Sequence, residues 1–176
     1  MKIDLESPLG EVAFVVGTAL DRAGIVAILT GAGAAAFHAP ASGAQSLDFV
    51  IELYTPGCDA EQALFELGYE RRGSVYFHDS NPLVLGFPPG PLRNGSVWET
   101  HRDGGNVLNV LSPTDSCLER LAEYAARGEE SALRQAIAVA RAQRACLDLE
   151  RVRRWSRAAD ERETRYRFEQ GLQDAT

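Results

Sequence analysis

The chain has 176 residues, of which 45% are hydrophobic and 24% are charged, which is enough for one globular domain, alone or with a small helical appendage. This composition excludes a disordered chain, a collagen and a coiled-coil rod. The formal net charge is −7 and is unevenly placed, because residues 1–112 carry 6 basic and 13 acidic side chains whereas residues 113–176 carry 12 of each. An acidic surface repels a phosphate backbone, so we expect no broad nucleic-acid interface on the front part, which would accept a divalent cation more readily.

We expect a cytoplasmic protein without a membrane-spanning helix. The apolar run at 12–37 is broken by two charged residues and several glycines, and therefore falls short of the roughly 18 uninterrupted apolar residues of a span. The N-terminal sequence MKIDLESPLG carries acids where a signal peptide carries basic residues. Cys58, Cys117 and Cys146 are odd in number and lack the paired spacing of a zinc site, which indicates reduced thiols.

The front part alternates helical and extended patterns. Ser7 and Pro8 are typical of an N-cap and a first helical residue, and the β-branched run at 25–30 is typical of a strand covered on both faces. Three prolines at 87–92 cannot sustain a sheet ladder and indicate a loop. In chain order we expect a helix from Pro8 to a stop at Gly24, strand 25–30, helix 31–37, strand 47–54, a helix capped by Asp59 and ending at Gly68, strands within 69–78 and 82–87, and a hairpin of 97–101 with 106–111.

From Ser112 onward the apolar period is helical. Ser112 or Thr114 can cap a helix that ends at Gly128, and further helices are expected at 131–143, at 149–157 after the cap Asp148, and at 161–172. We therefore predict an α/β domain with a mixed sheet and flanking helices over residues 1–111, followed by a C-terminal helical module over residues 112–176.

The segment 28–52 is the most informative for function. It places a buried strand, a Gly-X-Gly turn and a helix N-terminus ahead of a second strand that opens with Asp48. Backbone amides at such a helix start can hold phosphate oxygens, and an acid on the next strand can hold the accompanying Mg²⁺. Under the alternative interpretation, Gly31 and Gly33 only let a helix pack closely on the sheet, and Asp48 is a solvated acid at the sheet edge.

This segment resembles the nucleotidyltransferase-fold superfamily, whose minimal members include the antitoxin-type and abortive-infection nucleotidyltransferases of bacteria. Their pattern is a strand, Gly-Gly or Gly-Ser, a short helix, a spacer, and Asp-X-Asp on the next strand; here Gly31-Ala32 stands at the glycine step and LDFVIE at the second strand. The resemblance implies Mg²⁺ at a catalytic Asp48 and a nucleoside triphosphate held by Thr30, Gly31, Ala32, Gly33, Ser46 and, from the helical tail, Arg120.

The sequence departs from that pattern at its acids. If Asp48 is the second acid, Ser46 stands at the first position; if Asp48 is the first, Val50 stands at the second. We favour the former, because an apolar run follows the second acid in the family pattern. Gly86 stands where the third acid is expected, with Asp79 as a possible replacement. Two-metal phosphoryl transfer needs several carboxylates, so we expect a degenerate nucleotidyltransferase of toxin–antitoxin or phage-defence type, with residual or no transfer activity.

Two other functions are open. One is a non-catalytic protein-interaction module, whose cleft or apolar loop at 87–92 binds a protein partner. The other is RNA binding by the helix that carries four arginines and Trp155 within residues 151–157. Acids lie at helical spacing from those arginines, which favours a solvated, salt-bridged face over an RNA contact.

Overall fold

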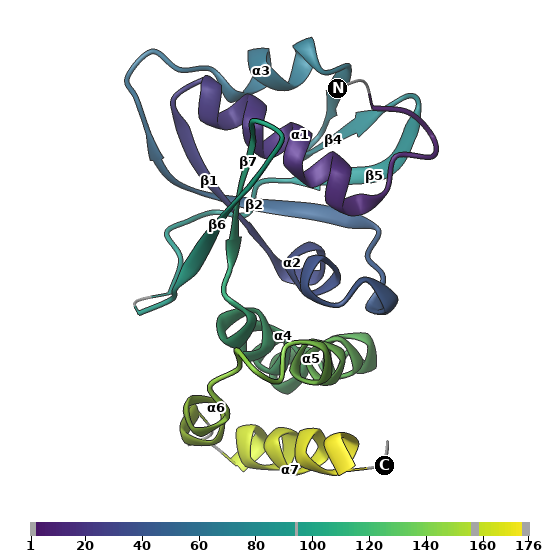
Figure 1. Ribbon diagram of the computed structural model, residues 1–176, viewed down its shortest axis with the longest axis vertical. Helices are drawn as coiled ribbons and strands as arrows, with labels where there is room; N and C mark the ends of the chain where they lie inside the picture. Colours follow the sequence, from purple (N-terminus) through teal and green to yellow (C-terminus); the bar gives the residue numbers. More distant parts are fainter. Residues whose placement is uncertain (1–2, 94, 156–158, 174–176) are drawn as a thin grey trace.

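The computed structural model describes residues 3–93, 95–155 and 159–173, and Figure 1 shows their arrangement. The elements in chain order are α1 (Leu9–Arg22), β1 (Ile25–Thr30), α2 (Gly31–His38), the short 3₁₀ helix η1 (Pro40–Ser42), β2 (Ser46–Tyr54), α3 (Ala60–Glu66), β3 (Tyr69–Arg72), β4 (Val75–His78), β5 (Asn81–Gly86), β6 (Trp98–Asp103), β7 (Asn106–Leu111), α4 (Pro113–Arg127), α5 (Glu130–Ala142), α6 (Leu149–Trp155) and α7 (Ala159–Gln173).

The described strands form one seven-stranded mixed sheet in the order β3-β4-β5-β2-β1-β7-β6, so the predicted α/β fold class is confirmed. β1 pairs antiparallel with β2 and parallel with β7, and β2 pairs parallel with β5. The central strand β1 is buried at every position except Val26, as its β-branched run predicts, whereas β2 is buried at Leu47, Phe49 and Val50 and becomes exposed toward its end. Their pairing brings the start of β2 beside the ends of both β1 and β5, and this is where the candidate site lies.

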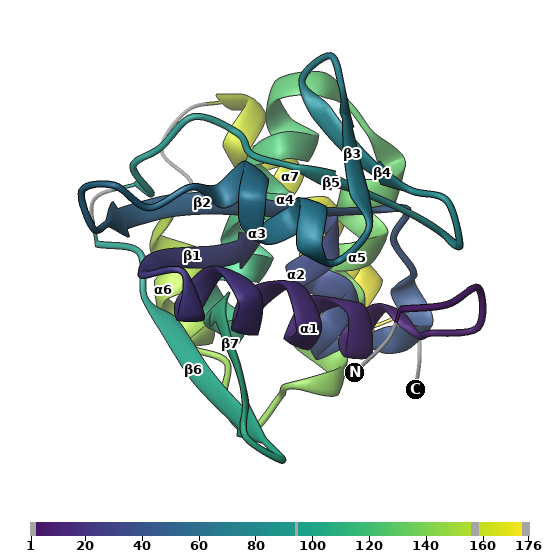
Figure 2. The same cartoon turned by 90° about the horizontal axis from the view of Figure 1, so that it is seen from above.

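Two clusters of buried apolar side chains stabilise the chain. One lies between α1 and the central strands, and the other joins α4, α5, α6 and α7. Helix α2 contributes Ala34 to the first cluster and Ala35 to the second, which also includes its C-cap residue Ala39. In Figure 1, α2 lies between the sheet and the pair α4 and α5, with α6 and α7 beyond them. Seen from above, α1 and α3 lie over the sheet, and the helices α4 to α7 lie behind it (Figure 2).

Several boundaries differ from the sequence predictions. Helix α1 begins at Leu9 with Pro8 as its N-cap, because the Ser7 hydroxyl instead donates to the Asp4 carboxylate and accepts from the Asp4 amide. Residues 69–78 form two strands joined by a turn at Gly73, whose φ of +68° favours glycine. Helix α7 begins at Ala159, two residues earlier than predicted, and residues 156 and 157 of the predicted third tail helix lie outside the described residues.

No helix in the described part of the chain is long and apolar enough to cross a membrane. The three cysteines are free thiols: Cys58 is half-buried, Cys146 is exposed, and burial raises the pKa of the Cys117 thiol to about 12. Cys117 is therefore protonated at neutral pH, and it acts as a small apolar core residue.

Candidate functional site

The site begins at the turn from β1 into α2. Thr30 is the N-cap of α2 in an extended conformation, but its side chain makes no capping bond; its hydroxyl donates to the Asp48 carbonyl at 3.1 Å. Gly31 has φ +64°, a left-handed conformation that glycine adopts without strain. A Cβ on Gly33 would lie 3.1 Å from atoms of Leu29 and Leu47, so this glycine lets α2 pack closely on the sheet.

Asp48 lies near the start of β2, at the edge of the sheet where the strands end, between Thr30 of β1 and Gly86 of β5. Its Oδ2 accepts a hydrogen bond from the Ser46 hydroxyl at 3.3 Å, so the two residues share a face as their spacing predicts. Its Oδ1 occupies the space that a side chain at Gly86 would need. The strand register therefore places a glycine beside Asp48, where the family pattern expects another carboxylate.

Glu119 of α4 belongs to this site, although no motif singled it out. Its Oε2 accepts a hydrogen bond from the Gly31 amide at 2.7 Å. Burial raises the pKa of Glu119, the Gly31 bond and the charges of Arg120 and Arg93 oppose that rise, and the Asp48 charge adds to it. In the sequence, Glu119 is marked only by its position next to Arg120. A carboxylate that caps a helix far away in the chain forms no pattern with its neighbouring residues.

Arg120 also reaches this turn. One of its terminal nitrogens lies 3.8 Å from the position that a Cβ on Gly31 would take. Its Nε is buried and has no hydrogen-bond partner among the described residues. A buried donor without an acceptor costs free energy, so Arg120 brings an unsatisfied donor to this turn.

Two other acids lie away from the site formed by Gly31, Asp48 and Glu119. Asp79 is exposed and pairs with Arg72 at 3.6 Å, in the turn before β5, whereas Gly86 is at the far end of that strand. Glu52 accepts from the Leu92 amide at 2.6 Å and so holds the loop after β5. Within the described ranges, no group of three or more His, Cys, Asp or Glu side chains could hold a metal ion. Asp48 and Glu119 are thus the carboxylates that the structure brings to this site.

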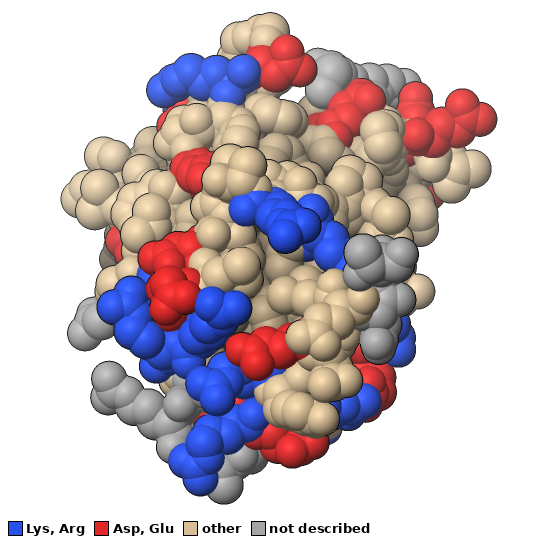
Figure 3. Space-filling view, turned by 60° about the horizontal axis from the view of Figure 1, so that its bottom comes forward, with Lys and Arg blue, Asp and Glu red and all other residues tan. Residues whose placement is uncertain are grey.

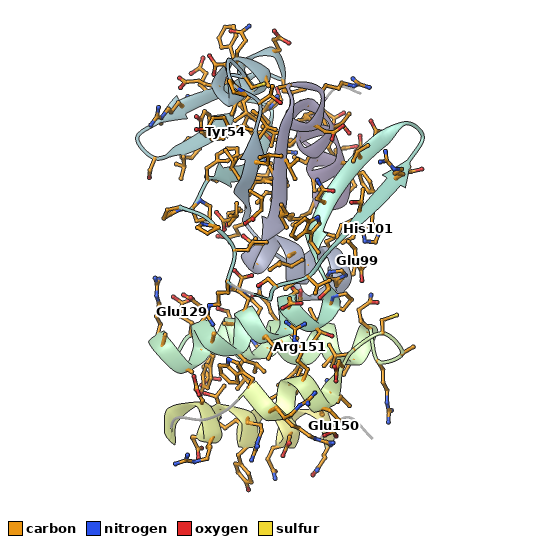
Figure 4. All side chains as sticks on the ribbon, turned by 90° about the vertical axis from the view of Figure 1, so that its left-hand side faces the viewer. Tyr54, Glu99, His101, Glu129, Glu150 and Arg151 are labelled. Atoms are coloured by element: carbon orange, nitrogen blue, oxygen red, sulfur yellow. The ribbon has the colours of Figure 1, made fainter. Side chains whose placement is uncertain are left out.

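A cavity of about 360 Å³ lies beside Glu119, between the loop after β5, the end of β7, α4 and α6. Its size suits a small ligand. Asp115 and Arg151 lie in its wall, and the Arg151 guanidinium binds both oxygens of the buried Asp115 carboxylate, at 2.6 and 2.8 Å. In Figure 4, Arg151 lies where α6 faces α4. The cavity is lined by Leu92, Arg93, Ser96, Leu111, Asp115, Leu118, Glu119, Arg151, Arg154 and Trp155.

The arginines of α6 have protein partners. Arg153 pairs with Glu150 at 2.7 Å, as the helical spacing predicts, and also with Glu169 of α7. Arg151 pairs with Asp115, which is distant in the sequence, and Arg157 lies outside the described residues. Figure 3 shows basic and acidic side chains interleaved over the helical part of the molecule. The Arg153–Glu150 pair agrees with the salt-bridged face that the helical spacing predicts.

Comparison with known proteins supports the fold. The chain is similar to a solved structure described as an antigenic nucleotidyltransferase-like protein from Paracoccidioides brasiliensis, with a TM-score of 0.65 and 14% sequence identity, over 97% of this chain and 91% of that chain. No protein-family model matches the sequence, and no curated protein matches it. At this level of identity the likeness concerns the fold: the chain has a nucleotidyltransferase-like fold.

Proposed function

We propose that this protein is a degenerate nucleotidyltransferase that binds a nucleoside triphosphate with Mg²⁺ and has residual or no transfer activity. One observation carries the proposal: the pairing of β2 with β5 sets Asp48 opposite Gly86, with the Asp48 carboxylate over that glycine. Two metal ions about 3.5–4 Å apart need bridging carboxylates. Asp48 can serve one ion together with phosphate oxygens and water, which is a binding arrangement rather than a two-metal centre.

The other groups at this site, the Gly31 amide and Arg120, favour the binding of an anionic ligand. The Gly31 amide points to a carboxylate oxygen, Glu119 Oε2, so it is already oriented toward a negative group. Arg120 supplies positive charge beside the same glycine. A triphosphate that reaches this amide must displace Glu119, and we expect Glu119→Ala to strengthen triphosphate binding for that reason.

Thermal-shift titration with the four ribonucleoside triphosphates, with and without Mg²⁺, tests the proposal. A ligand at about 100 times its dissociation constant adds about 2.7 kcal/mol to the free energy of unfolding, a clear rise in midpoint. We expect a Mg²⁺-dependent rise in the wild type that is lost in Asp48→Asn and kept in Asp79→Asn, a matched loss of one acid at an exposed turn.

Two outcomes would contradict the proposal. If no triphosphate raises the midpoint with Mg²⁺, the cleft does not bind nucleotide. If Asp48→Asn retains the full shift, Asp48 does not hold the metal. Efficient nucleotide transfer by the wild type would show that the site is not degenerate.

The second candidate is a non-catalytic protein-interaction module that keeps the fold without nucleotide binding, whereas the toxin–antitoxin or phage-defence setting belongs to the first proposal. Its supporting observation is the edge strand β6, where Trp98 is 41% exposed and Val97, the residue before the strand, is 52% exposed. An exposed edge can accept a strand from another chain. The loop at 87–92 is less available, because Phe87 packs on Phe49 and Tyr76. Co-purification of a stoichiometric partner without any nucleotide-induced shift would favour this candidate.

A further inference from the structure

The cavity beside Glu119 contains two guanidinium groups with donor nitrogens that have no partner among the described residues. The side chain of Arg93, on the loop after β5, makes no hydrogen bond or ion pair with the part of the chain that the structure describes, although its charge stabilises the Glu119 carboxylate. Among the described residues, the side chain of Arg154 of α6 bonds only through its Nε, which donates to the Glu150 carbonyl at 3.3 Å. Both side chains are exposed and line the same cavity. The guanidinium groups can therefore donate to a ligand.

The acids of the cavity do not neutralise these two arginines completely. The Asp115 carboxylate already accepts from Arg151, the Val97 amide and the Ser112 hydroxyl. The Glu119 carboxylate accepts from the Gly31 amide, and this one negative charge is shared between Arg120 and Arg93. With those groups satisfied internally, the cavity favours a ligand that brings negative charge and acceptor oxygens.

The third component is Trp155, whose half-buried indole lines the same cavity with Leu92, Leu111 and Leu118. An indole face binds flat aromatic groups by stacking, and leucines exclude water from their edges. A phosphate monoester carries about −1.5 to −2 charges near neutral pH, which matches two guanidinium groups.

We propose that this cavity binds a nucleoside monophosphate without a metal ion, with the base against Trp155 and the phosphate against Arg93 and Arg154. The choice of a nucleoside over other aromatic phosphates rests on the proposed function. Binding without a metal ion does not rest on the proposed function, because it follows from the two arginines and not from Asp48. The site thus differs from the Gly31 turn in its chemistry, although Glu119 borders both.

Fluorescence titration in EDTA tests this assignment. The chain has two tryptophans, so Trp98→Phe leaves Trp155 as the single reporter. We expect AMP, GMP, CMP or UMP to change the Trp155 emission in a saturable way. In the same background, Arg93→Gln combined with Arg154→Gln should weaken binding about tenfold or more, since each lost charge-assisted contact affects affinity. Arg134→Gln, which removes one exposed arginine of α5 away from the cavity, should leave the affinity unchanged.

The outcomes separate this inference from the proposed function. Monophosphate binding that persists in EDTA and in Asp48→Asn but weakens in the double arginine variant supports the inference, even if no Mg²⁺-dependent triphosphate binding is found. Binding that needs Mg²⁺ and Asp48 and ignores both arginines overturns it while the proposed function stands. Saturable binding of an oligonucleotide but of no mononucleotide also overturns it, as does a flat titration with all four monophosphates.

Discussion

At the scale of single residues, the strand register decides what Asp48 can do. Gly86 faces Asp48 across the β2–β5 pair, and the missing side chain leaves space that the Asp48 carboxylate occupies. A carboxylate at position 86 would meet Asp48 at close range, and neighbouring like charges repel unless a cation lies between them. The absent acid and the position of Asp48 are thus parts of one arrangement.

Gly86→Asp tests that relation. We expect the variant to unfold about 1–3 kcal/mol more easily than the wild type in EDTA, because the new side chain crowds Asp48 and adds a like charge. Mg²⁺ should restore part of this loss by binding between the two carboxylates. Urea unfolding with and without Mg²⁺ measures both effects.

The neutral control is Gly86→Asn, which has nearly the same volume as Asp and no charge. It should lose stability by crowding and should not respond to Mg²⁺. Equal responses of the Asp and Asn variants to Mg²⁺ would contradict the explanation by paired carboxylates.

The sequence was sufficient to find Asp48, Ser46 and Gly86, because all three lie on strands with clear apolar patterns. It was not sufficient to find Glu119 or Arg93, and it singled out Arg154 only as part of an arginine-rich helix and not as a cavity residue. Their roles depend on how the helical part packs against the sheet, which no spacing records. The Gly31–Glu119 bond joins residues 88 positions apart.

At the scale of elements, the Asp115–Arg151 pair joins three segments. Asp115 lies in the first turn of α4, Arg151 lies in α6, and Arg151 also donates to the Gly95 carbonyl in the loop before β6. The Asp115 side chain is 6% exposed and that of Arg151 is 34% exposed. Removing one partner leaves a buried charge without its counter-ion, which is costly.

A double-mutant cycle measures this link. Asp115→Ala should lower the free energy of unfolding by about 3 kcal/mol. This is the lower end of the cost of breaking a buried ion pair, because Arg151 is one-third exposed. Asp115→Ala and Arg151→Ala together should cost less than the sum of the single changes, with a coupling of about 1–3 kcal/mol. The measurement is urea unfolding of all four proteins.

The matched control is the surface pair Arg127–Glu123 on α4, where the Arg side chain is 69% exposed. Its coupling should be about 0.3–0.5 kcal/mol. A coupling for Asp115 and Arg151 no larger than this would mean that the pair does not hold α6 on α4.

Element boundaries followed from periodicity wherever a local signal was strong. Asp59 accepts from the Glu61 and Gln62 amides, and Gly128 ends α4 in a left-handed conformation, both as the sequence predicts. Ser7 was assigned wrongly, because Asp4 offers its hydroxyl a competing partner three residues away.

At the scale of the whole molecule, α2 connects the sheet to the helical part. Its last residue, His38, is buried; the His38 Nε2 donates to the Leu111 carbonyl at 2.7 Å, and the His38 carbonyl accepts from the Gln143 side chain of the segment after α5. One residue thus contacts the end of β7 and the end of α5. Periodicity predicts each of these elements separately, but their meeting at His38 is a property of the packing.

Burial lowers the pKa of His38, the Leu111 bond and the charge of Glu99 partly oppose this, and His101 adds to it. The unfolded chain therefore binds a proton at higher pH than the folded chain, so the contribution of His38 to stability is complete above its ordinary pKa of 6.5 and is lost as pH falls below that value.

We expect the free energy of unfolding to decrease from about pH 8 to about pH 5.5, and to decrease less in His38→Gln, whose amide can also donate to the Leu111 carbonyl. Glu119 acts in the opposite direction, since its raised pKa favours the folded state as pH falls, but it is present in both proteins and cancels in their difference. Urea unfolding at each pH gives that difference directly, and parallel curves for the two proteins would show that His38 does not titrate on unfolding.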